Sequence, residues 1–151
     1  DDFIKLSKEL EENFQIILIG LSDSQRKNLP GNIIGLGKLE SAKELSRYYS
    51  AADILVNPSV EETFGMTIAE ALACGTPAVV YNATACPEVI SSDTGIVVEK
   101  NDIRELKDSI HAIIKNGKNQ YSGRCVERAK KLFDKKVRYM DYIALYESLY
   151  K

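Results

Sequence analysis

Apolar residues follow two alternating patterns along this chain. In short runs, such as residues 15–19 and 78–81, nearly every residue is apolar, whereas in the longer segments between them apolar residues recur every three or four positions. A short, almost wholly apolar run is typical of a strand buried on both faces, and the longer spacing is typical of an amphipathic helix. The chain is therefore expected to alternate strands with helices.

Local signals set the bounds of these elements. Gly75 followed by Pro77 predicts a helix end, since glycine favours the position after a helix and proline cannot continue one. Strands that alternate with helices form a parallel sheet with helices on both faces, so we predict an α/β fold with a doubly wound parallel sheet. The expected strands are residues 15–19, 33–34, 53–57, 78–81 and 95–98, and the expected helices are residues 2–12, 41–52, 67–73, 102–115, 120–133 and 137–150.

The composition narrows the classes of partner. With 151 residues the chain has the length of one domain, and its net charge of −2 argues against a nucleic-acid partner, which normally requires a strongly basic surface. No block of Lys and Arg indicates a membrane anchor, although weak peripheral membrane association is compatible with the sequence. Three cysteines without CxxC spacing and a single histidine favour a reducing cytoplasm over a disulfide framework or a zinc site.

The loop that follows the strand at 53–57 holds the best candidate chemistry. In doubly wound sheets, ligands bind beyond the carboxyl ends of the strands, where loops lead into helices. Gly65 stands before the helix at 67–73, whose free N–H groups and positive dipole end attract an anion. Glu62 and Glu70 flank this glycine and could accept hydrogen bonds from hydroxyl groups. A nucleotide sugar, which joins two polyhydroxylated rings through a diphosphate, would suit such a site.

These residues also have simpler interpretations. Thr67 and Glu70 have the spacing of a capping box, in which Glu70 would only satisfy the start of its helix, and Glu62 could be a solvated loop charge. The residues alone leave these interpretations open. His111 is expected to be a partly exposed helix residue rather than a catalytic base. The tyrosines of the last helix are expected to pack in the core or, as the alternative, to face a partner: Tyr139, Tyr142, Tyr146 and Tyr150.

The stretch from residue 57 to residue 80 resembles the signature of the family-four, GT-B retaining glycosyltransferases. That signature has two glutamates separated by seven residues around a Phe-Gly pair, then Glu-Ala and an Ala-Cys-Gly-Thr-Pro stretch that enters a strand. The resemblance covers nearly the whole chain. The matching residues are Glu62, Phe64-Gly65, Glu70-Ala71 and Ala73-Cys74-Gly75-Thr76-Pro77, extended by Ser50-Ala51-Ala52-Asp53, Pro87-Glu88 and Gly95-Ile96-Val97-Val98.

The resemblance implies separate roles for the residues of this segment. Glu70 would bind the ribose hydroxyls of the donor, and Glu62, the catalytic residue, would bind the transferred sugar without acting as a nucleophile. Backbone N–H groups would contact the sugar and the diphosphate, and the loop at 35–38 would line the base pocket. Besides Glu70, the expected donor-binding residues are Phe64, Gly65, Met66, Thr67, Gly37 and Lys38.

The resemblance further implies that residues 1–151 form a nucleotide-sugar-binding domain, the Rossmann-like carboxyl-terminal half of a GT-B fold. The enzyme would transfer a hexosyl group with retention from a nucleotide-diphosphate sugar to a glycan or lipid-linked acceptor. No cofactor and no obligatory metal are expected. The alternatives are a non-catalytic nucleotide-binding α/β module and a GT-B epimerase.

The abrupt start at Asp1 predicts that the chain is a piece of a longer protein. The first strand of the domain, the basic turn after it and the amino-terminal acceptor domain would then lie outside these residues. We therefore expect the chain alone to bind nucleotide weakly and not to catalyse transfer. The expected setting is polysaccharide biosynthesis in the cytoplasm, which includes the inner face of the membrane.

Overall fold

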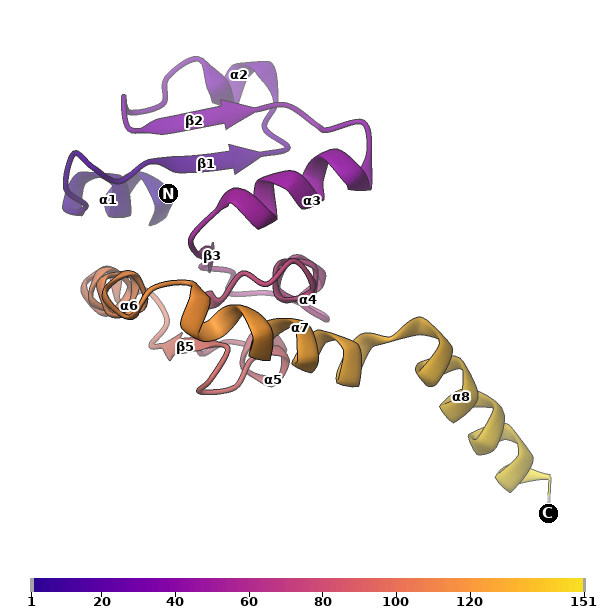
Figure 1. Cartoon of the computed structure of the whole chain (residues 1–151). Coiled ribbons are helices and arrows are strands. Elements are labelled where there is room, and N and C mark those ends of the chain that lie inside the picture. The colour runs from indigo at the N-terminus through magenta and orange to yellow at the C-terminus, as the bar shows by residue number, and fades with distance from the viewer. Residues whose placement is uncertain (1, 151) are drawn as a thin grey trace.

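Strands and helices alternate through most of the chain, as predicted (Figure 1). The structure is a computed structural model that describes residues 2–150. The strands are β1 (Ile16–Ile19), β2 (Ile33–Leu36), β3 (Leu55–Asn57), β4 (Ala78–Tyr81) and β5 (Gly95–Val98). The helices are α1 (Asp2–Glu9), α2 (Asp23–Arg26), α3 (Ala42–Ala51), α4 (Met66–Ala73), α5 (Cys86–Val89), α6 (Ile103–Asn116), α7 (Asn119–Phe133) and α8 (Lys135–Leu149).

Helices cover both faces of β4, whose four residues are fully buried. Ala78 and Val80 belong to a cluster formed with α4, α5 and α7, whereas Val79 and Tyr81 belong to a cluster formed with α1 and α6. Successive side chains of a strand point to opposite faces, so the two clusters lie on the two sides of the strand. The predicted α/β class and its doubly wound arrangement are confirmed.

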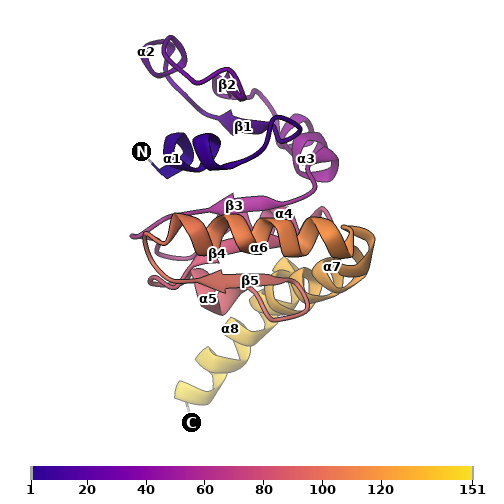
Figure 2. The same ribbon diagram turned by 90° about the vertical axis from the view of Figure 1, so that its left-hand side faces the viewer.

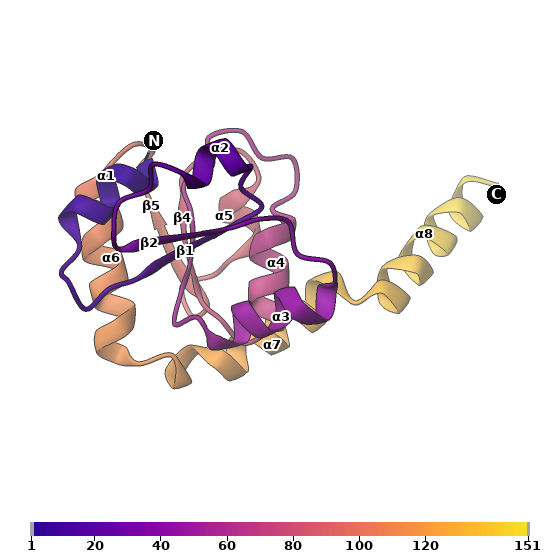
Figure 3. The ribbon, with the colours of Figure 1, turned by 90° about the horizontal axis from the view of Figure 1, so that it is seen from above.

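Hydrogen bonds divide the strands into two sheets. β1 pairs with β2, and β3, β4 and β5 pair in that order, with every pair parallel. Within residues 2–150 no strand joins β1 to β3, although β1 lies on the side of its sheet nearer to β3 (Figures 1 and 2). Seen from above, β1 and β2 cross over β4 and β5 (Figure 3). The expected parallel sheet is thus present as two pieces that side chains, rather than backbone hydrogen bonds, connect.

Helix α1 connects the two pieces by packing on α6. Leu6 is buried in the same cluster as Leu106 of α6. Just after α1, the ring of Phe14 lies edge-on against His111, with the ring centroids 5.1 Å apart. His111 Nε2 also lies 3.1 Å from Glu11 Oε2, and the His111 side chain is 38% exposed. His111 is therefore a partly exposed helix residue, as predicted, and it helps to hold α1.

A hydrogen bond also runs from β4 to α1. The buried phenol of Tyr81 donates to Asp2 Oδ2 over 3.0 Å. Burial, followed by this hydrogen bond, raises the pKa of Tyr81 to about 12. Since an unfolded tyrosine has a pKa of about 10, the folded state favours the protonated phenol. This contribution to stability is fully present below about pH 10 and is lost as the pH rises through about 12.

We expect Tyr81→Phe to lower the free energy of unfolding at neutral pH by about 1–2 kcal/mol, because it removes a buried hydrogen bond to a carboxylate. The difference in the free energy of unfolding between wild type and Tyr81→Phe should become smaller as the pH rises above about 10. Urea unfolding at neutral pH and at about pH 11 measures both effects, with Tyr139→Phe on the exposed face of α8 as the control. A difference that stays constant over this range would contradict the assignment.

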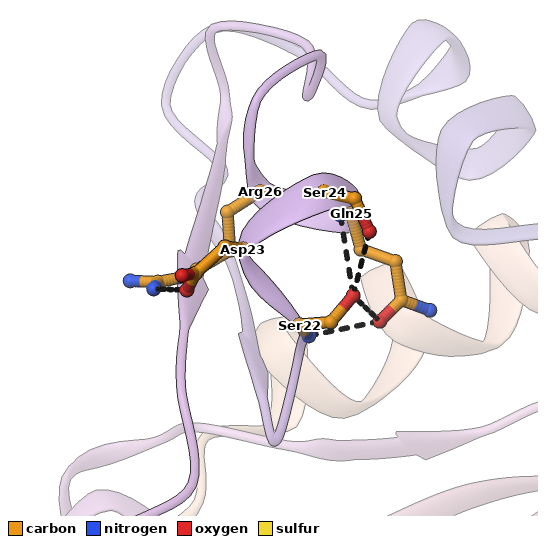
Figure 4. A network of polar contacts seen from close by, with 5 residues as sticks. All are labelled: Ser22, Asp23, Ser24, Gln25 and Arg26. Carbon is orange, nitrogen blue, oxygen red and sulfur yellow. Dashed lines mark hydrogen bonds and ion pairs between the residues drawn. The ribbon is translucent and has the colours of Figure 1, made fainter.

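Helix α2 is absent from the expected elements because its residues are polar and give no apolar spacing. Its N-cap is Ser22, whose Oγ accepts a hydrogen bond from the backbone N–H of Gln25 (Figure 4). In return, the Gln25 side chain accepts one from the backbone N–H of Ser22 over 2.9 Å. Asp23 and Arg26 form an ion pair on the same turn. The Ser-x-x-Gln spacing of this capping box is a sequence signal that would have predicted the helix start.

The last helix, α8, does not pack as predicted. It projects away from the rest of the chain (Figures 1 and 3), and none of its residues is buried. Tyr139, Tyr142 and Tyr146 are each more than half exposed. Their expected core packing is wrong, because within residues 2–150 no element other than α7 packs extensively on α8. Even so, no helix within residues 2–150 is long and apolar enough to cross a membrane.

Candidate functional site at the start of α4

The loop between β3 and α4 is fixed at its beginning by the last residue of the strand. Asn57 Nδ2 donates a hydrogen bond to Thr67 Oγ1 over 3.3 Å, and Asn57 Oδ1 accepts one from the backbone N–H of Ser59 over 3.0 Å. One amide side chain thereby connects the end of β3, the loop and the first turn of α4. This connection places the loop beside the start of the helix, as the sequence predicts.

Gly65, the N-cap of α4, has a backbone conformation that other residues rarely adopt. Its φ is +80°, in the left-handed region, and a Cβ there would lie 3.1 Å from both Ile68 and Val89. The Gly65 carbonyl accepts hydrogen bonds from the backbone N–H groups of Ile68 and Ala69. Within residues 2–150, no side-chain oxygen caps this helix. The N–H groups of Met66 and Thr67, at the positive end of the helix dipole, are therefore open to an anion.

Glu70 does not act as the capping residue of α4. The helix starts at Met66 with Gly65 as its N-cap, so Glu70 lies in the second turn, and the capping box that the spacing of Thr67 and Glu70 allows does not form. The half-buried Glu70 carboxylate instead accepts a hydrogen bond from the phenol of Tyr49 on α3, with 3.1 Å between the oxygens. The interpretation of Glu70 as a simple cap is therefore wrong.

Glu62 is half-buried and held by the next loop of the same sheet. Its backbone N–H donates a hydrogen bond to Thr84 Oγ1 over 3.0 Å, and Thr84 lies just beyond the carboxyl end of β4. One carboxylate oxygen of Glu62, Oε1, accepts a hydrogen bond from the backbone N–H of Thr63 over 3.2 Å. The neighbouring Glu61 is exposed. Of the two adjacent acidic residues, Glu62 is the one that is half-buried and whose carboxylate accepts a hydrogen bond within residues 2–150.

Apolar side chains also lie open beside the start of α4. Phe64 is 48% exposed and Met66 is 58% exposed. The ring of Phe64 lies edge-on against Phe133 at the end of α7, with the ring centroids 5.6 Å apart. Phe133 contacts the ring of Phe64 on one side. The rest of the Phe64 ring is exposed to solvent, close in sequence to the free N–H groups of Met66 and Thr67. An apolar surface beside an anion site suits a ligand that carries rings as well as a phosphate.

Gly37 and Lys38 lie just after β2, outside the loop and helix that hold the other predicted site residues. They follow β2, which extends to Leu36 rather than ending at residue 34 as expected, because Leu36 pairs with Ile19. The carbonyl of Gly37 accepts a hydrogen bond from Gly20, and Lys38 is exposed. Among residues 2–150, no hydrogen bond or ion pair joins Gly37 or Lys38 to the loop at 58–65 or to α4. Their expected role at a base pocket stays a prediction.

The predicted site residues did not include Tyr49, Asn57 and Thr84. Their side chains form hydrogen bonds that hold Glu70, Thr67 and the backbone of Glu62, respectively. Asn57 had a signal, since it is the polar residue that closes an apolar strand at its carboxyl end. Thr84 had a weaker signal, its place in the loop after β4. Tyr49 had none beyond helical spacing, because the sequence does not show which neighbour its phenol meets.

Two surface depressions lie elsewhere, at the amino-terminal ends of strands. One is lined by residues 12–15 and 31–32, which precede β1 and β2, and the other by Ser92 and Asp93, which precede β5, together with residues of α6 and α7. Neither contains a predicted site residue. The polarity of parallel strands favours the carboxyl ends of β3 and β4 as the ligand site.

The structure offers no protein-built metal cluster in the part of the chain that it describes. Among residues 2–150, no group of three or more His, Cys, Asp or Glu side chains is arranged to hold a metal ion. A metal could still arrive bound to a phosphate ligand. The expected independence from metal and cofactor therefore stays a prediction.

Sequence comparison gives a match that covers most of the chain. Residues 1–132 match the protein family described as glycosyl transferases group 1. An uncharacterised 41.2 kDa protein in the cps region of Klebsiella pneumoniae is 32% identical over 149 residues, which are 96% of this chain and 40% of that protein.

Structural comparison agrees with this match. The sucrose-phosphate synthase from Thermosynechococcus elongatus is similar with a TM-score of 0.83 and 27% identity, over 99% of this chain and 41% of that one. Anabaena HepE, solved in complex with UDP, is similar with a TM-score of 0.83 and 22% identity, over 97% of this chain and 44% of that one. At 22% identity the similarity to HepE concerns the fold alone. The chain spans less than half the length of each of these three relatives.

Proposed function

Because the chain belongs to the glycosyl transferases group 1 family, we propose that it is the donor-binding half of a retaining glycosyltransferase. The enzyme moves a hexosyl group from a nucleotide-diphosphate sugar to a glycan or a lipid-linked acceptor. This chain binds the nucleotide sugar, and the acceptor is bound mainly by a part of the protein outside these residues. The greater length of the relatives supports this division of labour.

The uncapped start of α4, flanked by two half-buried carboxylates, is the observation that carries this proposal. The free N–H groups of Met66 and Thr67 suit a diphosphate, which brings the negative charge that the helix dipole favours. Glu62 and Glu70 suit the hydroxyl groups of the sugar and the ribose on either side of it. Each hydrogen bond to a charged carboxylate is worth about 1.5–3 kcal/mol net.

In the proposed mechanism, α4 stabilises the leaving group. As the bond between the sugar and the diphosphate breaks, negative charge grows on the diphosphate oxygens, which the N–H groups of residues 66 and 67 stabilise. Glu62 accepts hydrogen bonds from hydroxyl groups of the transferred sugar and does not attack it. The acceptor hydroxyl approaches on the face from which the diphosphate leaves, and its proton passes to a diphosphate oxygen. The configuration of the sugar is thereby retained.

The nucleotide can be identified by titration calorimetry of the full-length protein with UDP, GDP and ADP. HepE, which shares this fold, was solved in complex with UDP. Binding of one nucleotide at micromolar concentration, followed by sugar transfer from the matching nucleotide sugar, is the expected result. Nucleotide binding without any transfer would favour the non-catalytic module, and a changed sugar configuration without transfer would favour the epimerase. The cytoplasmic location and the role in polysaccharide synthesis stay predictions.

Glu70→Gln is expected to weaken binding of the preferred nucleoside diphosphate about tenfold, because a neutral amide replaces the charged acceptor of the ribose hydroxyls. The fold should be kept, since the amide oxygen can still accept the hydrogen bond from Tyr49. Calorimetry measures the effect against Glu127→Gln, an exposed glutamate on α7, as the control. If Glu70→Gln bound the nucleotide as tightly as the wild type, the donor role of Glu70 would be wrong.

A further inference from the structure

Tyr49 is the one side chain that the structure places in hydrogen-bond contact with the Glu70 carboxylate, within residues 2–150. Its phenol donates to Glu70 Oε2 over 3.1 Å from the last turn of α3. The contact occupies one oxygen of the carboxylate and leaves Oε1 for a further donor. A hydrogen bond to a charged acceptor is roughly twice as strong as one between neutral groups, so it can hold the carboxylate in one orientation.

The end of α3 that carries Tyr49 is itself fixed to the body of the protein. The last carbonyl groups of a helix have no partner within the helix. Here the carbonyl of Tyr49 accepts a hydrogen bond from Thr76 Oγ1 over 2.5 Å, just beyond the other end of α4. The carbonyls of Ser50 and Ala52 each accept one from Lys118 Nζ over 2.6 Å, at the start of α7. The phenol is therefore presented to Glu70 from a backbone that α4 and α7 hold in place.

From this geometry we infer that Tyr49 is a positioning residue, which holds Glu70 Oε2 so that Glu70 Oε1 meets the ribose hydroxyls of the nucleotide donor. The inference rests on the donor-binding role proposed for Glu70. Ordering a free glutamate side chain costs up to about 2 kcal/mol of conformational entropy on binding. A carboxylate that is oriented beforehand avoids part of this cost, so the nucleotide binds more tightly without any new contact.

The phenol of Tyr49 also stays protonated under all ordinary conditions. Burial, followed by the negative charge of Glu70, raises the pKa of Tyr49 above its usual value. The residue therefore remains a hydrogen-bond donor, and the orientation of Glu70 does not depend on pH in the neutral range. Loss of the hydroxyl group removes the contact.

Tyr49→Phe removes this hydroxyl and keeps the ring that packs between α3 and α4. In the full-length protein, we expect Kd for the preferred nucleoside diphosphate to rise about three- to tenfold, with kcat at saturating donor within about twofold of wild type. The preference for the ribonucleotide over its 2′-deoxy analogue should shrink, which a purely structural role would not cause. Tyr48→Phe, on the same helix, is the matched control, and both variants should unfold near the wild-type urea midpoint.

A double-substitution cycle separates this inference from the proposed function. The variant that combines Tyr49→Phe with Glu70→Ala should bind nucleotide no more weakly than Glu70→Ala alone, because alanine at this position leaves Tyr49 no carboxylate to orient. Fully additive losses would overturn the inference, and so would unchanged binding by Tyr49→Phe alongside weakened binding by Glu70→Gln. Unchanged binding by Glu70→Gln would remove the donor role of Glu70 and the inference with it.

Discussion

Replacing Glu62 with glutamine in the full-length protein is expected to lower kcat at saturating donor about a hundredfold. The reason is the positive charge that develops on the transferred sugar as the diphosphate leaves. A carboxylate that accepts hydroxyl hydrogen bonds stabilises this charge more strongly than a neutral amide does. Loss of about 2.7 kcal/mol of transition-state stabilisation corresponds to this factor.

The contacts of Glu62 allow a substitution by glutamine to remove the charge while keeping the hydrogen bonds of the residue. Glutamine keeps an oxygen that can accept the hydrogen bond from the Thr63 backbone, and it leaves untouched the bond from the Glu62 backbone to Thr84. The loop between β3 and α4 should therefore keep its shape. What changes is the charge at a half-buried position beside the start of α4.

Initial rates of transfer at saturating nucleotide sugar measure this effect, and nucleotide affinity by calorimetry shows whether the site is intact. Glu61→Gln is the matched control, since Glu61 is the adjacent glutamate and is exposed, so the kcat of this variant should equal that of the wild type. Wild-type turnover by Glu62→Gln at saturating donor would show that the assigned role is wrong. A comparable loss of kcat in Glu62→Gln and Glu61→Gln would instead indicate a general effect of negative charge in this loop.

Gly95→Ala should destabilise the fold more than Tyr81→Phe does. Gly95 opens β5 and pairs with Ala78 of β4. A Cβ at Gly95 would lie 2.1 Å from the Ala78 carbonyl oxygen and 3.0 Å from its carbonyl carbon, which are backbone atoms that no rotamer change can move. Overpacking of a core costs about 1–3 kcal/mol, and a contact with fixed backbone should reach or exceed the upper end.

A loss of about 3 kcal/mol is a large part of the roughly 5–15 kcal/mol that stabilises a typical domain, and it should lower Tm by roughly 10 °C. Thermal unfolding followed by circular dichroism measures the shift. Gly123→Ala on α7 is the control, because a Cβ there meets no atom within 4 Å and alanine favours a helix, so this variant should be slightly more stable than wild type. Equal Tm values for Gly95→Ala and wild type would contradict the close approach of β4 and β5.

The elements that the sequence predicted best are those whose apolar runs are bounded by strong signals. The bounds of β4 match the expected strand at 78–81, because four apolar residues follow Pro77 and precede the polar Asn82. The helix end at Gly75 is also confirmed, with the N–H groups of Gly75 and Thr76 bonding back to Leu72 and Ala71. Local residue order is sufficient for these features, since their partners lie within a few positions.

Features that depend on distant partners could not be predicted in the same way. Tyr48 and Tyr49 occupy adjacent positions on one helix, and only the packing of α3 on α4 shows that Tyr49 meets Glu70. The tyrosines of α8 have the spacing of a helix that packs in a core. Such a pattern does not show whether another element packs on the face that carries them. The grouping of strands into two sheets likewise follows from which backbones come into hydrogen-bond contact, which hydrophobic spacing does not specify.

The division into two sheets also sets the order in which the chain can fold. The sheet of β1 and β2 joins neighbouring segments, whereas the hydrogen bond from Tyr81 to Asp2 closes a loop of 79 residues. Because longer loops cost more entropy to close, the first sheet can form early, while its docking must wait for α6 and β4. In the native state we expect the reverse order, with the β1–β2 unit opening while β3, β4 and β5 stay paired. The chain is then expected to behave as two cooperative units of different local stability.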